Sequence, residues 1–539
     1  MASPAPKSPE VSEKTKKYDR QLRLWGDHGQ SALESANVCL INVTGVGTEI
    51  LKSLVLPGIG AFTIVDGGVI SEEDVGINFF LDVENIGKSR AEIATQLLLE
   101  LNPDVHGDYV FENPLQLFQN NPHFFNNFTL VIATNLPERI LVPLSKHLWE
   151  NGTPLISARS YGFIGSIRIQ LREHTVVESH PDNQNPDLRL DVPFPSLKEY
   201  IDGIDLGKMD LKEHAHIPYI VPLYKILQVW KKLHNDNLPK NYKEKEAFRQ
   251  LIRDGIKKNE HGNPEEEENF EEAIHAVNFA LLPTTVPKNI KEILNDESCI
   301  NLTHKSKPFW IIAKAVRDFI DNEGGGYLPL RGSLPDMTAE TSSYINLQQI
   351  YHNQALRDAE VVYRRVQQLL HQLNQSDDTI TEDEVKQFCK HAANLAVIRG
   401  SSIADEYDPK SSSASNIAMQ LENPDSLLVH YVMLRGVDRF YAEYNTYPGE
   451  FDDQVEPDIL KLKSNIAKLL GEWGCSPLSK DDYVHEICRY GGAEIHSVSS
   501  YLGGCVAQEV IKLVTSQYKP INNTFIYDAI STSTATFQL

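Results

Sequence analysis

The 539-residue sequence has no long apolar run, few cysteines and a deficit of basic residues. No stretch approaches the ~20 consecutive apolar residues that a membrane-spanning helix needs, so we expect no membrane segment. The six cysteines are scattered without a CxxC pair, which argues against a disulfide framework or a zinc ribbon. The 51 basic residues face 74 acidic ones, a formal charge of −23, which disfavours binding to nucleic acid or to an anionic membrane.

The first 17 residues are rich in Pro, Ser and Lys and contain no apolar core of a secretory signal. We therefore expect a flexible N-terminus over residues 1–17 and a cytoplasmic or nuclear protein. Hydrophobic residues make up 41% of the chain and charged residues 23%, a composition typical of globular proteins. The length predicts about three to four domains.

Before residue 175 the sequence alternates between strand-like and helix-like segments. Apolar runs that end in turn residues predict strands, and apolar spacings of three and four residues predict helices between them. This order predicts an α/β fold whose sheet is mostly parallel. Residues 162–171 alternate like an added antiparallel strand. The expected strands are 38–43, 61–66, 128–133 and 154–158, and the expected helices are 48–56, 88–101 and 138–149.

After residue 175 the pattern becomes mainly helical, and it returns to α/β near the C-terminus. We divide the chain into 18–172, a helical insertion over 173–475, and a closing part over 476–539. The expected helices of the later parts are 218–233, 242–258, 265–281, 309–320, 345–373, 483–500 and 504–515, and the expected edge strands are 524–527 and 534–537. The segment from Gly324 to Met337 is apolar but cannot be helical, because its prolines remove backbone donors. It could cover its own core or cross to a partner.

A nucleotide site is suggested where the first strand meets the first helix. Gly45 and Gly47 follow the strand, and Asp66 ends the next strand, 21 residues after Gly45. Glycines let phosphates approach the backbone, the helix N-terminus supplies N–H donors, and an acid can accept from a ribose hydroxyl. However, Ile50 stands where a dinucleotide motif has its third glycine. Two glycines are a weak signal, which a helix packed on a sheet without ligand would also show.

Motifs at both ends of the chain resemble the adenylation domains of enzymes that activate ubiquitin-like proteins, which share a ThiF/MoeB-like fold. The opening motif is Tyr18–Gly26 with Glu49–Gly60, and the closing motif is Gly503–Lys512 with Pro520–Asn523. The segment over residues 186–195 also resembles this family. The resemblance implies a Rossmann-like adenylation domain, split by a large, mainly α-helical insertion that corresponds to a degenerate catalytic-cysteine region.

The implied reaction joins ATP to the modifier's C-terminal carboxylate, giving an acyl-adenylate and pyrophosphate, before a cysteine thiolate takes the acyl group. Active members of the family use a GxGGxG turn, an acid for ribose, an Asn, an Arg and a Lys for the nucleotide, and an Asp for Mg²⁺. Asp66 stands at the position of the ribose-binding acid. Arg90 stands at the position of the Lys and carries the same charge. The other positions are changed in this chain: the two earlier glycines fall on Asn42 and Thr44, the Asn and Arg on Asp74 and Ile77, and the metal-binding Asp on Asn135 or Thr134.

These changes predict a pocket that cannot catalyse adenylation. Each lost electrostatic contact is worth on the order of 3 kcal/mol in a transition state, so the loss of the metal carboxylate and the arginine costs roughly 10⁴-fold or more. We expect Gly45, Gly47, Asp66 and Arg90 to line a degenerate pocket that holds neither nucleotide nor metal alone. The acidic neighbours of Cys299 also disfavour it as a nucleophile.

The length and the helical insertion favour a likeness to the regulatory subunit of the heterodimers that activate Nedd-type modifiers for attachment to cullins. The regulatory subunit of the SUMO-activating enzyme is the alternative, and an NAD(P)-dependent oxidoreductase is a remote one. The resemblance implies two partners, a catalytic subunit that carries ATP and Mg²⁺ and the Nedd-type modifier. It also implies that Arg20 contacts the ATP phosphates of the partner, although Arg20 could instead pair with a nearby acid. The expected partner contacts are Leu328, Pro329, Leu330, Arg331, Pro335 and Met337.

Overall fold

The computed structural model describes residues 13–181, 185–423, 425–478 and 480–539. The chain divides into unit 1, which comprises Met1–His174 and Val397–Leu539, and unit 2, Thr175–Ala396. The expected N-terminal segment lies mostly outside the described residues, and its last part, Glu13–Lys17, is helix α1. None of the helices in the described part has the length and apolar character required to cross a membrane.

Unit 1 is built on an eight-stranded sheet with the order β10-β9-β6-β5-β4-β1-β2-β3. Five neighbouring strands, β5 to β3 in that order, run parallel, as the alternation predicts. β6 pairs antiparallel with β5, which confirms the added strand. The strand β3 was not predicted, because its residues are mostly exposed and form no apolar run. The strands are β1 (Asn37–Ile41), β2 (Ala61–Val65), β3 (His106–Val110), β4 (Leu130–Thr134), β5 (Leu155–Tyr161), β6 (Ile164–Gln170), β9 (Thr524–Asp528) and β10 (Ser533–Phe537).

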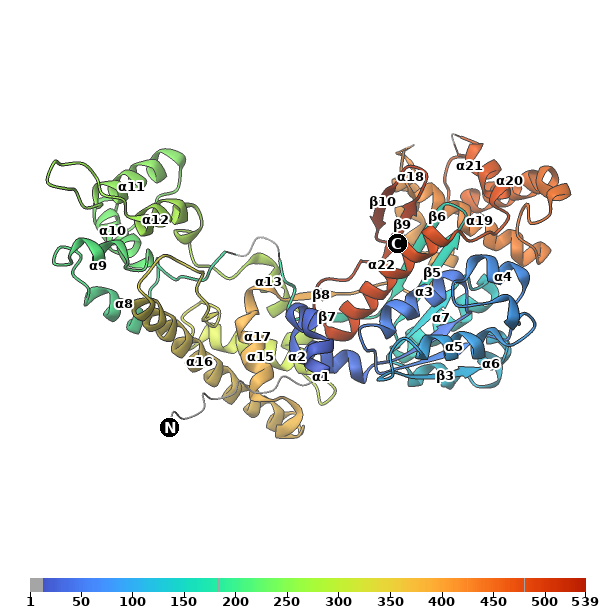
Figure 1. Cartoon of the computed structure of the whole chain (residues 1–539), viewed down its shortest axis with the longest axis horizontal. Coiled ribbons are helices and arrows are strands. Elements are labelled where there is room, and N and C mark those ends of the chain that lie inside the picture. Colours follow the sequence, from blue (N-terminus) through green and yellow to red (C-terminus); the bar gives the residue numbers. More distant parts are fainter. Residues whose placement is uncertain (1–12, 182–184, 424, 479) are drawn as a thin grey trace, which may run out of the picture. The chain divides into compact units, whose positions relative to one another are not determined.

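Helices cover both faces of this sheet, and alternate side chains of β1 divide between the two cores. Val38 and Leu40 join the core that contains α2, α3, α5 and α22. Cys39 and Ile41 join the opposite core, with α6 and α7. Figure 1 shows α3 and α22 lying together beside the strands. The helices named here are α2 (Asp19–Ser35), α3 (Gly45–Val55), α5 (Arg90–Leu99), α6 (Pro114–Asn120), α7 (Glu138–Asn151) and α22 (His496–Thr515), and the remaining short ones in this half are α4 (Glu72–Ile77), η1 (Val83–Asn85) and η2 (Pro122–Asn127).

The opening and closing sequence motifs meet around α3. A Cβ atom on Gly58 (φ +86°) would lie 2.7 Å from the hydroxyl of Tyr18, so this turn needs glycine. A Cβ atom on Gly503 would lie 2.6 Å from the Cβ of Glu49, so α22 approaches α3 closely there. Residues at opposite ends of the sequence thus form one packed layer of unit 1.

Unit 1 also contains residues 397–475, which we expected to lie in the insertion. The predicted start of the insertion, residue 173, lies within two residues of the observed boundary, but the separate unit ends at Ala396 rather than at 475. The reason is that α19 and α20 belong to one hydrophobic core with Tyr161 and Ile164 of the sheet. Amphipathic spacing shows that a helix is half-buried, not what it is buried against. The elements of this part are η5 (Ile403–Tyr407), α18 (Ser412–Leu421), α19 (Leu428–Tyr444), η6 (Asp452–Gln454), α20 (Val455–Glu472) and α21 (Asp482–Tyr490).

The predicted helix over 483–500 is interrupted in the structure. Gly491 and Gly492 have φ angles of +58° and +85°, which only glycine adopts readily, and they end α21. The chain then runs without helix until α22 begins at His496. This break places Glu494 on a connection beside the N-terminus of α3.

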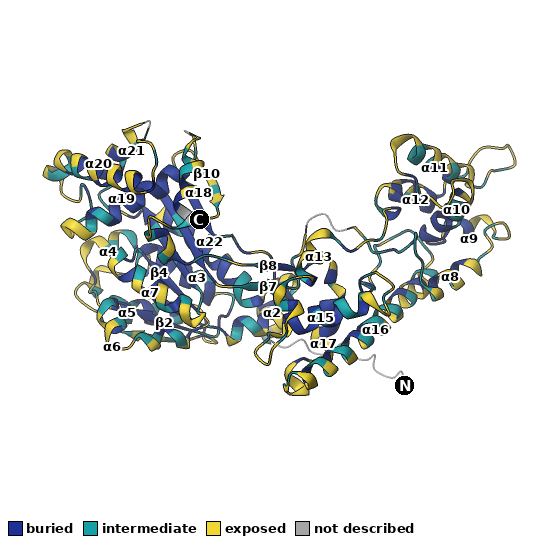
Figure 2. Cartoon of the chain, turned by 180° about the vertical axis from the view of Figure 1, so that it is seen from behind, coloured by how far each residue is buried: buried dark blue, intermediate teal, exposed yellow. Residues whose placement is uncertain are grey.

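Unit 2 is helical, as predicted. One core joins α8, α10, α11 and α12 with the first half of α16. In Figure 2, much of α15 is drawn in the buried colour, whereas the long helix α16 has many exposed residues between its buried ones. The elements are α8 (Pro195–Asp202), α9 (Leu211–Ala215), α10 (Ile220–Leu233), α11 (Tyr242–Asp254), α12 (Glu268–Ala280), α13 (Lys288–Leu294), α14 (Glu297–Ile300), α15 (Pro308–Asp321), α16 (Thr341–Gln372), η3 (Asp377–Thr379), α17 (Glu382–Lys390) and η4 (Ala392–Asn394). Short strands at the two connections between the units, β7 (His174–Val176) and β8 (Ala396–Ile398), pair with each other.

Candidate functional site

The candidate site lies where β1, β2 and β4 end and α3 begins. In parallel α/β sheets this edge is where ligands bind, and the free N–H groups of the helix attract anions. Thr44 is the N-cap of α3, and its hydroxyl accepts a hydrogen bond from the nitrogen of Gly47 at 3.2 Å. The N–H group of Gly47 is therefore already capped, and the sequence resemblance puts the phosphate at the remaining N–H groups of this first turn.

The carboxylate of Glu494 lies at this position. Its Oε2 accepts a hydrogen bond of 2.7 Å from the nitrogen of Gly45, and its Oε1 accepts one of 3.0 Å from Nδ2 of Asn135. The residue is only 7% exposed. Burial raises the pKa of Glu494 from 4.5 to about 7, against the opposing effect of these hydrogen bonds. In either protonation state the side chain fills the space next to the helix N-terminus.

The two glycines serve internal packing in this chain. A Cβ atom on Gly45 would lie 2.9 Å from Oε2 of Glu494, and one on Gly47 would lie 2.9 Å from the carbonyl oxygen of Asn42. Both glycines are buried. In a phosphate-binding turn the phosphate lies close to the glycine backbone. Here atoms of the protein itself occupy that place.

Asp66, the expected ribose acid, is only 1% exposed and fully engaged. Its Oδ1 accepts from the nitrogen of Gly68 at 2.6 Å, and its Oδ2 accepts from the nitrogen of Val43 at 2.8 Å. Nη2 of Arg90 lies 3.1 Å from both oxygens. A carboxylate with these four contacts has no acceptor site left for a ribose hydroxyl.

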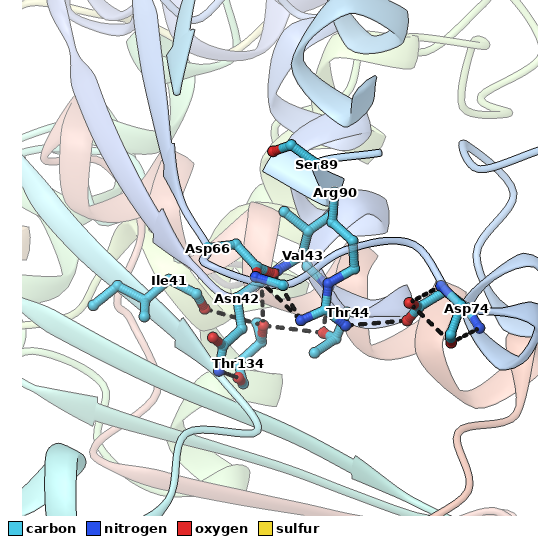
Figure 3. A network of polar contacts seen from close by, with 12 residues as sticks. Ile41, Asn42, Val43, Thr44, Asp66, Asp74, Ser89, Arg90 and Thr134 are labelled. Atoms are coloured by element: carbon cyan, nitrogen blue, oxygen red, sulfur yellow. Dashed lines mark hydrogen bonds and ion pairs between the residues drawn. The ribbon is translucent and has the colours of Figure 1, made fainter. Parts of the chain in front are cut away.

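Arg90 links two carboxylates across the pocket. Its Nη1 donates to Oδ1 of Asp74 at 3.1 Å, while Nη2 contacts Asp66. Burial alone would lower the pKa of Arg90, but the two carboxylates raise it above its ordinary value. Asp74 is fixed in turn by a capping box with Ser71 at the start of α4. Figure 3 shows Arg90 reaching between Asp66 and Asp74, so the cation kept by the sequence is neutralised within the chain.

The positions of the lost glycine and of the lost metal ligand are joined to each other. The hydroxyl of Thr44 donates to Oγ1 of Thr134 at 3.0 Å, and Thr134 donates to the carbonyl oxygen of Asn42 at 2.8 Å. Neither Thr134 nor Asn135 offers the carboxylate that Mg²⁺ prefers. Across the described residues, no group of three or more His, Cys, Asp and Glu side chains is placed to hold a metal ion. In this arrangement a phosphate at the N-terminus of α3 would have to displace Glu494, and neither Thr134 nor Asn135 would offer a carboxylate to its Mg²⁺.

Arg20, unlike the four pocket residues, lies outside this network. It is on α2, and its side chain is 90% exposed. Its Nε lies 4.0 Å from Oδ2 of Asp19, at the limit of an ion pair. The side chain is therefore available to a second molecule.

The expected partner contacts in the 324–337 segment differ in how far they are exposed. Leu328, Pro329 and Leu330 are buried, and Leu330 is 2% exposed within the core of unit 2. These three residues belong to a loop that packs on the core of unit 2. Burial of three consecutive apolar side chains is favourable because it removes their surface from water. Arg331, Pro335 and Met337 are half-buried, and their role in a partner contact stays a prediction.

Two further residues, Cys299 and His214, also have internal roles. Cys299 is fully buried, and burial raises the pKa of its thiol to about 11, so it is poorly suited as a nucleophile. His214 lies 2.5 Å from Glu267 within the core of unit 2. Sequence reasoning missed Glu494 entirely, because the residue that it contacts lies 449 positions away and no local pattern marks the pair.

The family model and the sequence relatives match nearly the whole chain. The ThiF family matches residues 18–539. A "NEDD8-activating enzyme E1 regulatory subunit" of Danio rerio is 54% identical over 528 residues, which cover 98% of this chain and 99% of that protein. The protein of the same name from Drosophila melanogaster is 52% identical over 541 residues and covers all of both chains. "NEDD8-activating enzyme E1 regulatory subunit AXR1" of Arabidopsis thaliana is 40% identical over 97% of this chain and 96% of its own length. Among solved structures, "Crystal Structure of SeMet PaaA" superposes with a TM-score of 0.26 at 20% identity, over 32% of this chain and 55% of that one.

Proposed function

This chain belongs to the ThiF family, among the regulatory subunits of NEDD8-activating E1 enzymes, and we propose that it is the non-catalytic half of such an enzyme. A second, catalytic chain would bind ATP and Mg²⁺ and form the adenylate and thioester of NEDD8. The full-length relatives are named for NEDD8, which favours this modifier over SUMO and over a dinucleotide-dependent oxidoreductase. We keep the cytoplasm or nucleus as the expected compartment.

The observation that carries this proposal is the contact between Glu494 and Gly45. The carboxylate takes up the N–H group that a nucleotide phosphate would need, at 2.7 Å. Arg90 is likewise paired with Asp66 and Asp74 instead of remaining free for a phosphate. These contacts support the proposal that the chain acts as a structural part of a complex and does not bind nucleotide itself.

Reconstitution tests the proposal directly. Purified chain, catalytic chain, NEDD8 and Mg-ATP should together give an ATP-dependent thioester, and omission of either chain should abolish it. The same mixture with SUMO in place of NEDD8 should give none. A thioester formed without the present chain would remove its required role.

Arg20 is the best candidate for a direct contribution to the partner's site. An exposed guanidinium without a strong ion pair can stabilise negative charge that develops on phosphates bound elsewhere. Arg20→Ala should leave assembly with the catalytic chain intact and slow ATP–pyrophosphate exchange by about a hundred-fold.

The matched control is Arg23→Ala, because Arg23 lies on the same helix, is 68% exposed and pairs with Asp19 at 3.2 Å. It should leave the exchange rate unchanged. If Arg20→Ala behaves like Arg23→Ala, Arg20 is only a surface residue and the chain contributes no catalytic contact.

The surface that receives the catalytic chain is better sought near the pocket than in the 324–337 segment. Residues 69–86 expose several large apolar side chains, among them Phe79 at 76% and Val83 at 69%. Exposed apolar side chains gathered in one segment mark an interaction site. We assign this segment to the contact with the catalytic chain.

A further inference from the structure

Unit 2 contains a cavity of about 330 Å³ that plays no part in the site described above. A volume of this size suits a small organic ligand. Its walls come from the loop after residue 185, the end of α12, the 324–337 segment and α17. The polar side chains that line it include Asp187, Arg189, Asp191, Thr284, Arg331 and Lys390.

Both carboxylates of the cavity are already engaged. Asp187 pairs with Arg189, with 2.6 Å between Oδ1 and Nε, and Arg189 also donates to the carbonyl oxygen of Leu328 at 2.8 Å. Asp191 accepts from the nitrogen and the hydroxyl of Thr284 at 2.7 and 2.6 Å. These contacts use both carboxylates within the wall of the cavity. Two basic side chains that line it, Arg331 and Lys390, are not paired with either carboxylate.

Arg331 is the more informative of these two. Within the described part of the chain its guanidinium makes no hydrogen bond or ion pair, and its Nε is buried without a partner. Burial lowers the pKa of Arg331, and the negative charge of Asp187 only partly offsets this. A half-buried, unpaired guanidinium is costly, because it has lost hydration and gained no acceptor. Lys390 is exposed at the end of α17 and lines the same cavity.

We propose that this cavity binds a small ligand that carries an oxyanion, a carboxylate or a phosphate, through the guanidinium of Arg331 with Lys390 as a second cation. An oxyanion supplies the acceptors that Arg331 lacks, and a planar guanidinium suits both chemistries by parallel hydrogen bonds. The rest of the chain is strongly acidic, so its general field repels anions and binding depends on this local site. The assignment does not depend on how the complex handles nucleotide.

Calorimetric titration of the full-length chain with inorganic phosphate, and separately with succinate, at matched ionic strength tests this assignment. Saturable binding of phosphate alone would identify a phosphate site, and binding of succinate alone a carboxylate site. Arg331→Gln should weaken the binding about ten-fold or more. The control Arg364→Gln, which changes an exposed arginine of α16 outside the cavity, should bind like the wild type.

The assignment fails if neither anion binds saturably, or if Arg331→Gln binds as well as Arg364→Gln. Should Arg331→Gln not fold, Arg331→Lys and Lys390→Gln replace it. Each of these should weaken the binding by at least about three-fold, because one loses the parallel geometry and the other a charge. Unchanged binding in both would overturn the proposal.

Discussion

Oε2 of Glu494 lies 2.7 Å from the backbone nitrogen of Gly45, although 449 residues separate them in the chain. The connection that carries Glu494 runs between α21 and α22, and the nitrogen belongs to the first residue of α3. A carboxylate at a helix N-terminus is favourable, because the exposed N–H groups carry partial positive charge. The chain thus supplies its own acceptor at the position where the sequence resemblance implied a phosphate.

Glu494 makes stability depend on pH in a predictable direction. Its pKa is about 7 in the folded chain against an ordinary 4.5, so the folded state holds the proton more tightly than the unfolded state. Wild-type stability should therefore fall as the pH rises from about 4.5 to about 7, by at most about 3 kcal/mol. Glu494→Gln cannot titrate and should lack this part of the slope.

Melting temperatures measured from pH 5 to pH 8 check this dependence. Because Gln also alters the contact with Asn135 at every pH, the slope is compared and not the absolute value. Glu100→Gln, a change at an exposed position, should keep the wild-type slope. A Glu494→Gln variant with the wild-type slope would mean that the carboxyl titrates normally.

Arg90 should be needed for folding and not for catalysis. Arg90→Gln would leave Asp66, which is 1% exposed, and the partly buried Asp74 without their cation. Removal of one partner from such a pair costs about 3 kcal/mol. Urea unfolding should show this loss, with Lys88→Gln on the exposed neighbouring position as the unaffected control. Unchanged stability would show that the two carboxylates are solvated in solution.

Leu330 and Phe79 should separate core packing from partner binding. Leu330→Ala removes a side chain that is 2% exposed and should lower the free energy of unfolding by about 3 kcal/mol. Phe79→Asp changes a side chain that is 76% exposed, so it should leave the melting temperature unchanged and weaken co-purification with the catalytic chain. The reverse pattern would return the 324–337 segment to the interface and remove residues 69–86 from it.

The sequence predicted the fold well where local patterns decide it. Four of the five parallel strands, the added antiparallel strand β6 and the five longest helices of unit 2 (α10, α11, α12, α15 and α16) were expected within a few residues, whereas α8, α9, α13, α14 and α17 were not predicted. No individual helix was predicted within residues 397–475, and α19 and α20 share their core with Tyr161 and Ile164, which lie far away in sequence. The exposed strand β3 lacked an apolar signal altogether.

At the site, the sequence predicted which groups are missing but not what replaces them. Gly45, Gly47, Asp66 and Arg90 do come together, as expected. Their new partners could not be foreseen, because a contact such as that of Glu494 depends on the break at Gly491 and on tertiary packing. The predicted helix over residues 483–500 included residue 494. In such a helix Glu494 would have had no special position.

The stoichiometry of Mg-ATP binding tests the central claim most directly. Calorimetric titration of the complex with its catalytic chain should give one nucleotide per pair of chains, and the isolated chain should bind none. Two nucleotides per complex, or tight binding by the isolated chain, would mean that Glu494 leaves the N-terminus of α3 to a phosphate and that the pocket is functional.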